Sequence, residues 1–100
     1  MNKTDYIKLI KEELDDLDGI TGAVQDIRNE TVYDEVRNRY MLLTIGIDDG
    51  IPVFEVAVSI KITDDDKILV EHNLTEFNFE KELLLKGVPI TAFANQLKQL

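Results

Sequence analysis

The sequence predicts one α+β domain over residues 1–100, with an N-terminal helix, a four-stranded antiparallel meander and a C-terminal helix in two layers. Three observations lead to this prediction. Apolar residues near the N-terminus recur every three or four positions, as they do along one face of a helix. The middle of the chain alternates apolar and polar residues between short polar turns, which is typical of a meander. A third segment carries signals for the start and the end of a helix.

The N-terminal segment has an apolar stripe that favours a helix packed on a sheet. Asn2 or Thr4 can cap its start, and Gly19 is placed to end it. The stripe consists of Tyr6, Leu9, Ile10, Leu14 and Leu17.

The first two strands are predicted at residues 24–33 and at Arg39–Asp48. Polar residues dilute the pattern of the first strand. The second begins with apolar residues on both faces, so we expect it to lie in the centre of the sheet. Asp48-Asp49-Gly50 then forms a turn, because Gly accepts a positive φ at no steric cost.

The third and fourth strands follow, separated by a turn at residues 63–67. The fourth begins at Ile68 and ends near His72. The third alternates over a long run, which predicts a half-buried strand. Its predicted buried side consists of Phe54, Val56, Val58, Ile60 and Ile62.

The C-terminal helix is predicted to start at Asn78 or Thr75 and to end at Gly87, with Val88 making the accompanying apolar contact. Residues 90–100 are predicted to form either a last short helix or a frayed tail. The four-residue spacing of Phe93 and Leu97 favours the helix.

The composition restricts the classes of function. The chain has 44% hydrophobic residues, no cysteine and a net charge of −9, which excludes disulfides and thiolate zinc sites and disfavours binding to nucleic acid or anionic membranes. Such a charge suits a basic protein partner, or it only solvates the surface. No signal peptide or spanning segment is evident, so a cytoplasmic location is expected.

Catalytic and metal sites are not predicted, and no cofactor is expected. His72 is the only histidine, and a pair with Glu71 or Glu76 would be the one acid–base candidate. A hydrogen-bonding surface histidine is the competing interpretation. Asp64-Asp65-Asp66 lacks the glycine and the distal glutamate of an EF-hand, so a solvated turn is expected there.

The predicted partner-binding residues lie at turns and strand ends. They are Arg37, Arg39, His72 and Glu76. Two arginines so close together can contact a partner carboxylate or a phosphate, although an ordinary charged turn has the same composition. The strand at residues 24–33 is the candidate edge for pairing with a partner or with a second copy of the chain.

The order of several motifs resembles that of the XisI family over nearly the whole chain. Residues 37–48 match R-x-x-Y-x-L-L-x-x-G-W-D, residues 72–76 match H-[DN]-G-T-E, and Glu82-Leu83 followed by Gly87-Val88-Pro89 matches E-L…G-V-P. The chain departs from these patterns at Ile47 and Leu74.

The resemblance implies an accessory, non-catalytic role. XisI-like proteins control excision of the fdxN element in filamentous cyanobacteria, together with XisH, a nuclease-like partner, and a separate recombinase. We therefore expect a protein that binds an XisH-like partner. The alternatives are an acidic inhibitor that occupies the basic cleft of a nucleic-acid enzyme, and a small enzyme that uses His72 in an enclosed pocket.

Overall fold

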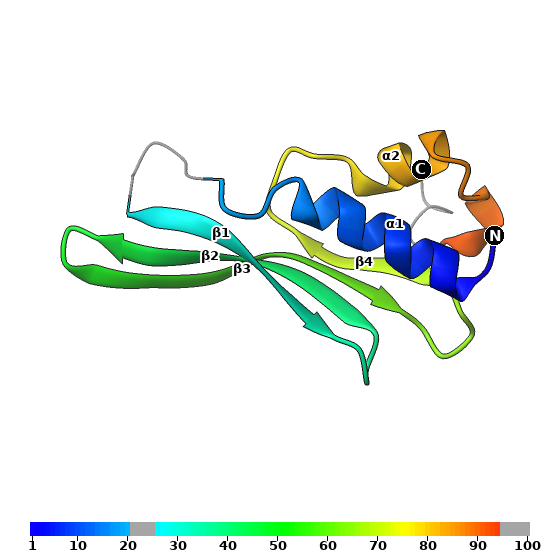
Figure 1. Cartoon of the computed structure of the whole chain (residues 1–100), viewed down its shortest axis with the longest axis horizontal. Helices are drawn as coiled ribbons and strands as arrows, with labels where there is room; N and C mark the ends of the chain where they lie inside the picture. The colour runs from blue at the N-terminus through cyan, green and yellow to red at the C-terminus, as the bar shows by residue number, and fades with distance from the viewer. Residues whose placement is uncertain (21–25, 95–100) are drawn as a thin grey trace.

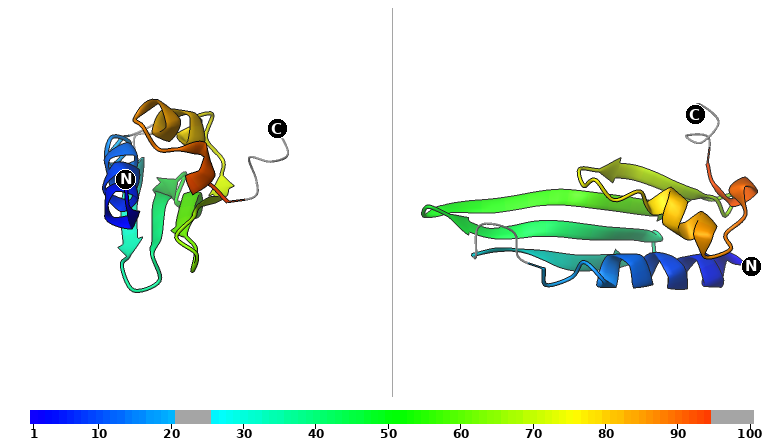
Figure 2. Two further views of the ribbon diagram at one scale, coloured as in Figure 1. Left: turned by 90° about the vertical axis from the view of Figure 1, so that its right-hand side faces the viewer. Right: turned by 90° about the horizontal axis from the view of Figure 1, so that it is seen from above.

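Both helices lie on one face of a four-stranded antiparallel sheet in the computed structural model, which describes residues 1–20 and 26–94 (Figure 1). The views in Figure 2 show the same two layers from the end and from above. The strand order β1-β2-β3-β4 is that of a meander, so the predicted α+β architecture is confirmed. The elements are α1 (Lys3–Asp15), β1 (Ile27–Asp34), β2 (Arg39–Asp48), β3 (Ile51–Ile62), β4 (Ile68–Asn73), α2 (Phe79–Leu85) and the 3₁₀ helix η1 (Ile90–Ala92).

Asn2 caps α1 through a reciprocal pair of hydrogen bonds with Asp5. The Asn2 side chain accepts from the Asp5 N–H at 3.0 Å, and the Asp5 carboxylate accepts from the Asn2 N–H at 2.9 Å. Thr4, the other predicted cap, lies inside the helix. The helix ends at Asp15, so the predicted end at Gly19 was wrong: Gly19, with φ of 74°, instead donates its N–H to the Asn29 carbonyl on β1.

The ends of α2 agree with the prediction. Asn78 is its cap, and its side chain accepts from the Lys81 N–H at 3.0 Å. Gly87 has φ of 98°, and the N–H of Val88 donates to the Leu83 carbonyl at 3.0 Å, which is the bond of a Schellman motif. Val88 is buried, as the motif requires.

The segment after α2 runs back beside β4. Phe93 has extended backbone angles, forms an isolated parallel bridge with Ile68, and is only 5% exposed. The N–H of Ala94 donates to the Ile68 carbonyl at 2.8 Å. The predicted short helix is present as the 3₁₀ helix η1 (Ile90–Ala92), but it stops before Phe93 because Phe93 pairs with β4. Leu97 lies outside the described residues.

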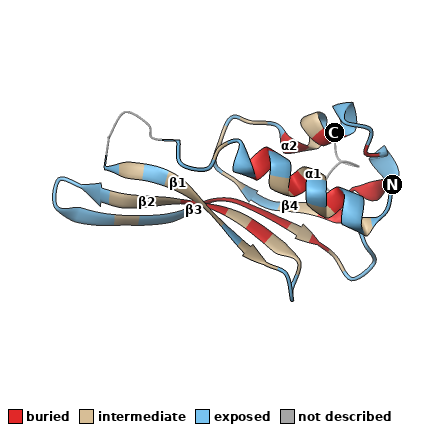
Figure 3. Cartoon of the chain, in the orientation of Figure 1, coloured by how far each residue is buried: buried red, intermediate tan, exposed pale blue. Residues whose placement is uncertain are grey.

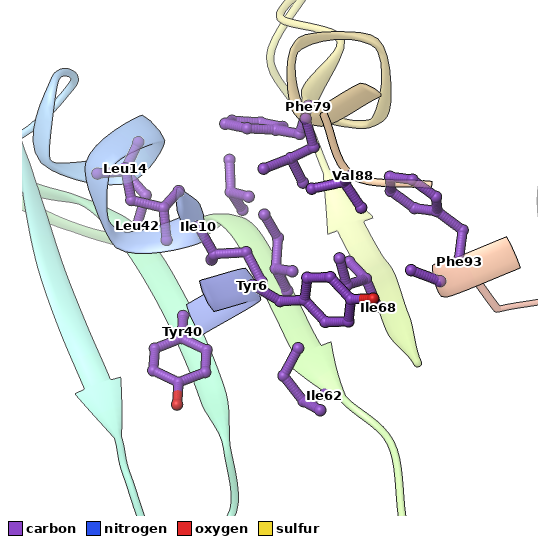
Figure 4. Close-up of a cluster of buried hydrophobic side chains, with 14 of the residues drawn as sticks. Tyr6, Ile10, Leu14, Tyr40, Leu42, Ile62, Ile68, Phe79, Val88 and Phe93 are labelled. Carbon is purple, nitrogen blue, oxygen red and sulfur yellow. The ribbon is translucent and has the colours of Figure 1, made fainter. Parts of the chain in front are cut away.

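The core fills the space between the helices and the right-hand part of the sheet in Figure 1, where the buried residues gather (Figure 3). The core residues come from α1 and α2, from β2, β3 and β4, and from the segment after α2 (Figure 4). Those with no exposed surface are Ile10, Leu14, Tyr40, Val58, Ile60, Ile68, Phe79 and Leu83. The β2–β3 hairpin extends past the helices, with much of its end exposed (Figure 3).

A β-bulge changes which side of β3 is buried. Leu42 pairs with Val58 and Leu43 pairs with Val56, so Ala57 has no partner of its own on β2. Because one extra residue reverses the alternation of a strand, Val56 and Phe54 lie on the face opposite Val58. The prediction that Phe54 belongs to the buried side was therefore wrong, and its exposed fraction is 75%.

Candidate protein-binding site

Arg39 is the centre of a polar cluster that spans three strands. Its guanidinium donates twice to the carboxylate of Glu71 on β4, at 2.7 and 3.1 Å, which is a bidentate geometry. The hydroxyl of Ser59 on β3 donates to the same carboxylate at 2.9 Å. Sheet pairing therefore holds the side chain of Arg39 in one orientation on the face opposite the helices.

The charges in this cluster stabilise one another. The hydrogen bonds from Arg39 lower the pKa of the Glu71 carboxyl, against partial burial, and Ser59 adds to this effect. The same contact raises the pKa of Arg39. Glu71 is thus ionised at neutral pH. Two N–H groups of the Arg39 guanidinium are bonded to Glu71, so only its other N–H groups can donate to a further acceptor.

A second β-bulge explains why Glu71 joins the cluster. Ser59 pairs with His72, but the next residue, Ile60, pairs with Val70, so Glu71 is the extra residue on β4. At a bulge two successive side chains turn toward one face. Simple alternation in β4 does not predict this placement, because a bulge depends on how β4 pairs with β3.

Arg37 lies in the β1–β2 turn and contacts Asp34 rather than the Arg39 cluster. Its guanidinium is 3.2 Å from the Asp34 carboxylate, which also accepts from the backbone N–H of Arg37 and Val36. The backbone N–H of Arg37 is the largest cause of the lowered pKa of Asp34. The side chain of Arg37 keeps 72% of its surface exposed, so it is available to a partner.

His72 and Glu76 are both exposed, on β4 and in the loop before α2. In the described ranges 1–20 and 26–94, no hydrogen bond or ion pair joins either side chain to Arg37 or Arg39. The enzyme hypothesis required an enclosed pocket around His72, and the exposure of His72 contradicts that requirement. Within the same ranges no group of three or more His, Asp or Glu is arranged to hold a metal ion.

The edge of β1, predicted as a pairing edge, is already occupied in part. Backbone groups of Asn29 and Thr31 that point away from β2 are hydrogen-bonded to the connection between α1 and β1. The bonds are Gly19 N–H to Asn29 O at 2.9 Å, Asn29 N–H to Ile20 O at 3.0 Å and Thr31 N–H to the Asp18 carboxylate at 2.8 Å. A second strand cannot add at these positions without displacing this connection.

In the described part of the chain, no helix covers the sheet face opposite α1 and α2 (Figures 1 and 2). Strand register places an apolar patch on that face. Alternation along β3 does not predict this patch, because the bulge at Ala57 is what brings Phe54 and Val56 beside Ile45 and Leu43 of β2. In register, Leu43 lies beside Val56, Ile45 beside Phe54, and Met41 beside Val32. We call these six residues the open-face patch: Val32, Met41, Leu43, Ile45, Phe54 and Val56.

These features define a two-layer α+β domain with an exposed apolar sheet face and charged residues at its strand ends. The sequence model of the XisI protein family matches residues 1–96. The chain therefore belongs to the XisI family. A comparison with curated proteins gave no match.

Two solved structures from Anabaena variabilis ATCC 29413 share this fold. An XisI-like protein has a TM-score of 0.81 and 26% sequence identity, over 96% of this chain and 87% of that one. The fdxN element excision controlling factor XisI has a TM-score of 0.73 and 24% identity, over 95% of this chain and 86% of that one. The likeness extends over nearly the whole of each chain.

In the described part of the chain, no helix is both long enough and apolar enough to span a membrane.

Proposed function

We propose that this chain is a regulatory accessory protein of DNA excision that acts by binding an XisH-like, nuclease-fold protein. Membership of the XisI family over residues 1–96 is the observation that carries the proposal. One solved structure of similar fold is that of an fdxN element excision controlling factor.

The surface chemistry supports a protein partner. A net charge of −9 is repelled by the phosphates of DNA and attracted by the basic surface of a DNA-binding protein. Arg37 is exposed, and Arg39 is held in place by Glu71, so both present cations at the end of the sheet. His72 and Glu76 add exposed polar groups on and after β4.

The test is co-expression of the tagged full chain with the XisH-like protein of the same host, followed by nuclease treatment and affinity capture. We expect a stoichiometric complex. Arg37→Glu should weaken it, whereas Lys81→Glu, a reversal of an exposed cation on α2, should leave it intact. Recovery of this chain without the XisH-like protein would contradict the proposal.

An acidic inhibitor that occupies a nucleic-acid enzyme's basic cleft is the second candidate, favoured by the same net charge. Binding of that kind weakens steeply with salt and is lost when DNA is added, because the chain and the DNA compete for the same cations. An accessory subunit that binds its partner outside the DNA-binding cleft should stay bound when DNA is added. Competition by a DNA duplex in the capture experiment therefore separates the two candidates.

A further inference from the structure

We propose that the open-face patch is the interface of a homodimer, in which the occupant is the same patch of a second copy of this chain. The inference comes from the exposure, charge and strand pairing of the described residues. It does not depend on the identity of any excision partner.

The patch combines a buried centre with an exposed aromatic side chain. Leu43 is only 8% exposed and lies between its register partners Glu30 on β1 and Val56 on β3. Phe54 on β3 pairs with Ile45, the next residue after Leu43 on this face of β2, and is 75% exposed. Val32 on β1 is 38% exposed. An aromatic side chain presented from a regular strand beside a packed aliphatic centre has the character of an interface anchor.

The charge of this face identifies a second copy as the occupant. Among the described strand residues, register and contacts place three cations, Arg28, Arg39 and Lys61, on this face together with three anions, Glu30, Asp34 and Glu71. The charges of the strand residues on this face therefore cancel, and the net charge of −9 is carried by the rest of the chain.

Two copies with this excess repel each other in most orientations. They meet without net repulsion when their neutral faces approach. A basic partner, by contrast, is attracted to the acidic remainder of the surface. The neutral apolar face is thus left free to contact the same face of a second copy.

Local ion pairs strengthen this argument. Arg28 and Glu30 lie 3.5 Å apart at the β1 side of the patch, and Arg39 and Glu71 lie 2.7 Å apart toward β4. Each pair has one cation and one anion at the rim of the patch. The cation of one copy can therefore lie against the anion of the same pair in the second copy. A polar rim of this kind around an apolar centre is the usual anatomy of a protein interface.

The sheet edges are less suitable for self-association. The connection after α1 occupies backbone groups of Asn29 and Thr31 on β1, and Ala94 bonds to Ile68 on β4. Contact between the open faces leaves these bonds intact. It also gives an isologous dimer with two stacked sheets, about 10 Å apart, between two outer layers of helices.

The test is the mass of the full chain in solution, by light scattering on a sizing column and by sedimentation equilibrium up to about 100 μM. We expect wild type at twice the chain mass of 11.4 kDa. Phe54→Lys should weaken the dimer at least about 30-fold, because two ammonium groups then enter the apolar centre. Phe54→Leu should retain it.

The matched control is Leu85→Lys, which places the same charge on a 72% exposed apolar residue of α2. It should leave the dimer unchanged. Circular dichroism checks that each variant keeps the wild-type spectrum. We expect it to, because Phe54 and Leu85 are both largely exposed and their replacement removes little buried surface.

A monomeric wild type at the highest concentration would overturn the proposal, as would a dimer that Phe54→Lys leaves intact. Equal loss of dimer in Leu85→Lys would also overturn it, because the contact would then not be specific to this face. Failure to capture an XisH-like protein would not change any of these masses.

Discussion

Gly46 occupies a site in β2 where the structure leaves no space for a side chain. A Cβ there would lie 1.9 Å from the carbonyl oxygen of Asp26 and 2.8 Å from the Cα of Ile27, both of which belong to the backbone. Its φ of 149° is also one that residues with a side chain rarely adopt. Gly46→Ala should therefore push the start of β1 away from β2.

The cost of Gly46→Ala follows from two effects. The unfavourable backbone conformation costs about 1–3 kcal/mol. Moving Asp26 breaks the 3.1 Å bond that its carbonyl accepts from the Ile47 N–H, worth about 1 kcal/mol. We expect a total loss of about 2–4 kcal/mol in the free energy of unfolding, a large share of the stability of a small domain.

Urea unfolding followed by circular dichroism at one fixed protein concentration measures this loss. The matched control is Gly50→Ala in the β2–β3 turn, where φ is 76° and a Cβ meets nothing within 4 Å. It should cost only about 1 kcal/mol, from the backbone conformation alone. If Gly46→Ala were no more destabilising than Gly50→Ala, the argument from the close backbone approach would be refuted.

Three further predictions concern the core and its ion pairs. Phe79→Ala removes a fully buried ring between α2 and the sheet and should cost about 3–5 kcal/mol in urea unfolding, whereas a loss below about 1 kcal/mol would show that Phe79 is not core. Lys86→Met leaves the buried carboxylate of Glu13 without the cation 2.6 Å away, so thermal unfolding should show a larger loss than for Lys81→Met; equal losses would contradict this. Glu71→Gln should be less stable than wild type at pH 7. The difference should close as pH falls below the ordinary carboxyl value of 4.5, because the pKa of Glu71 is lowered in the folded state and protonation removes its contribution; a gap that persists at low pH would refute this.

The helix ends show what local sequence can predict. The residue types of Asn78 and Gly87 predict a helix start and a helix end, and the structure confirms both. A cap depends on hydrogen bonds within three or four residues, so its evidence is local. Gly19 has an equally suitable residue type, yet α1 ends earlier because the segment after it bonds to β1.

The candidate site was predicted only in part. The residue type of Arg39 and its place at a strand end predict a binding residue, but its partner Glu71 is 32 positions away along the chain. That contact exists because β3 lies between β2 and β4 and because a bulge turns Glu71 toward Arg39. Arg37 is close to Arg39 in sequence, but the structure pairs Arg37 with Asp34 instead.

The sequence by itself determined the layers of this protein, the order of its strands and its family, because periodicity, turn residues and motif order are properties of the chain. Only the tertiary structure decided which faces are covered. Two bulges shift strand register by one residue, and each shift moves side chains to the other face of the sheet. Strand pairing thus moved Phe54 from the expected core to the open-face patch, a placement that no local pattern contains.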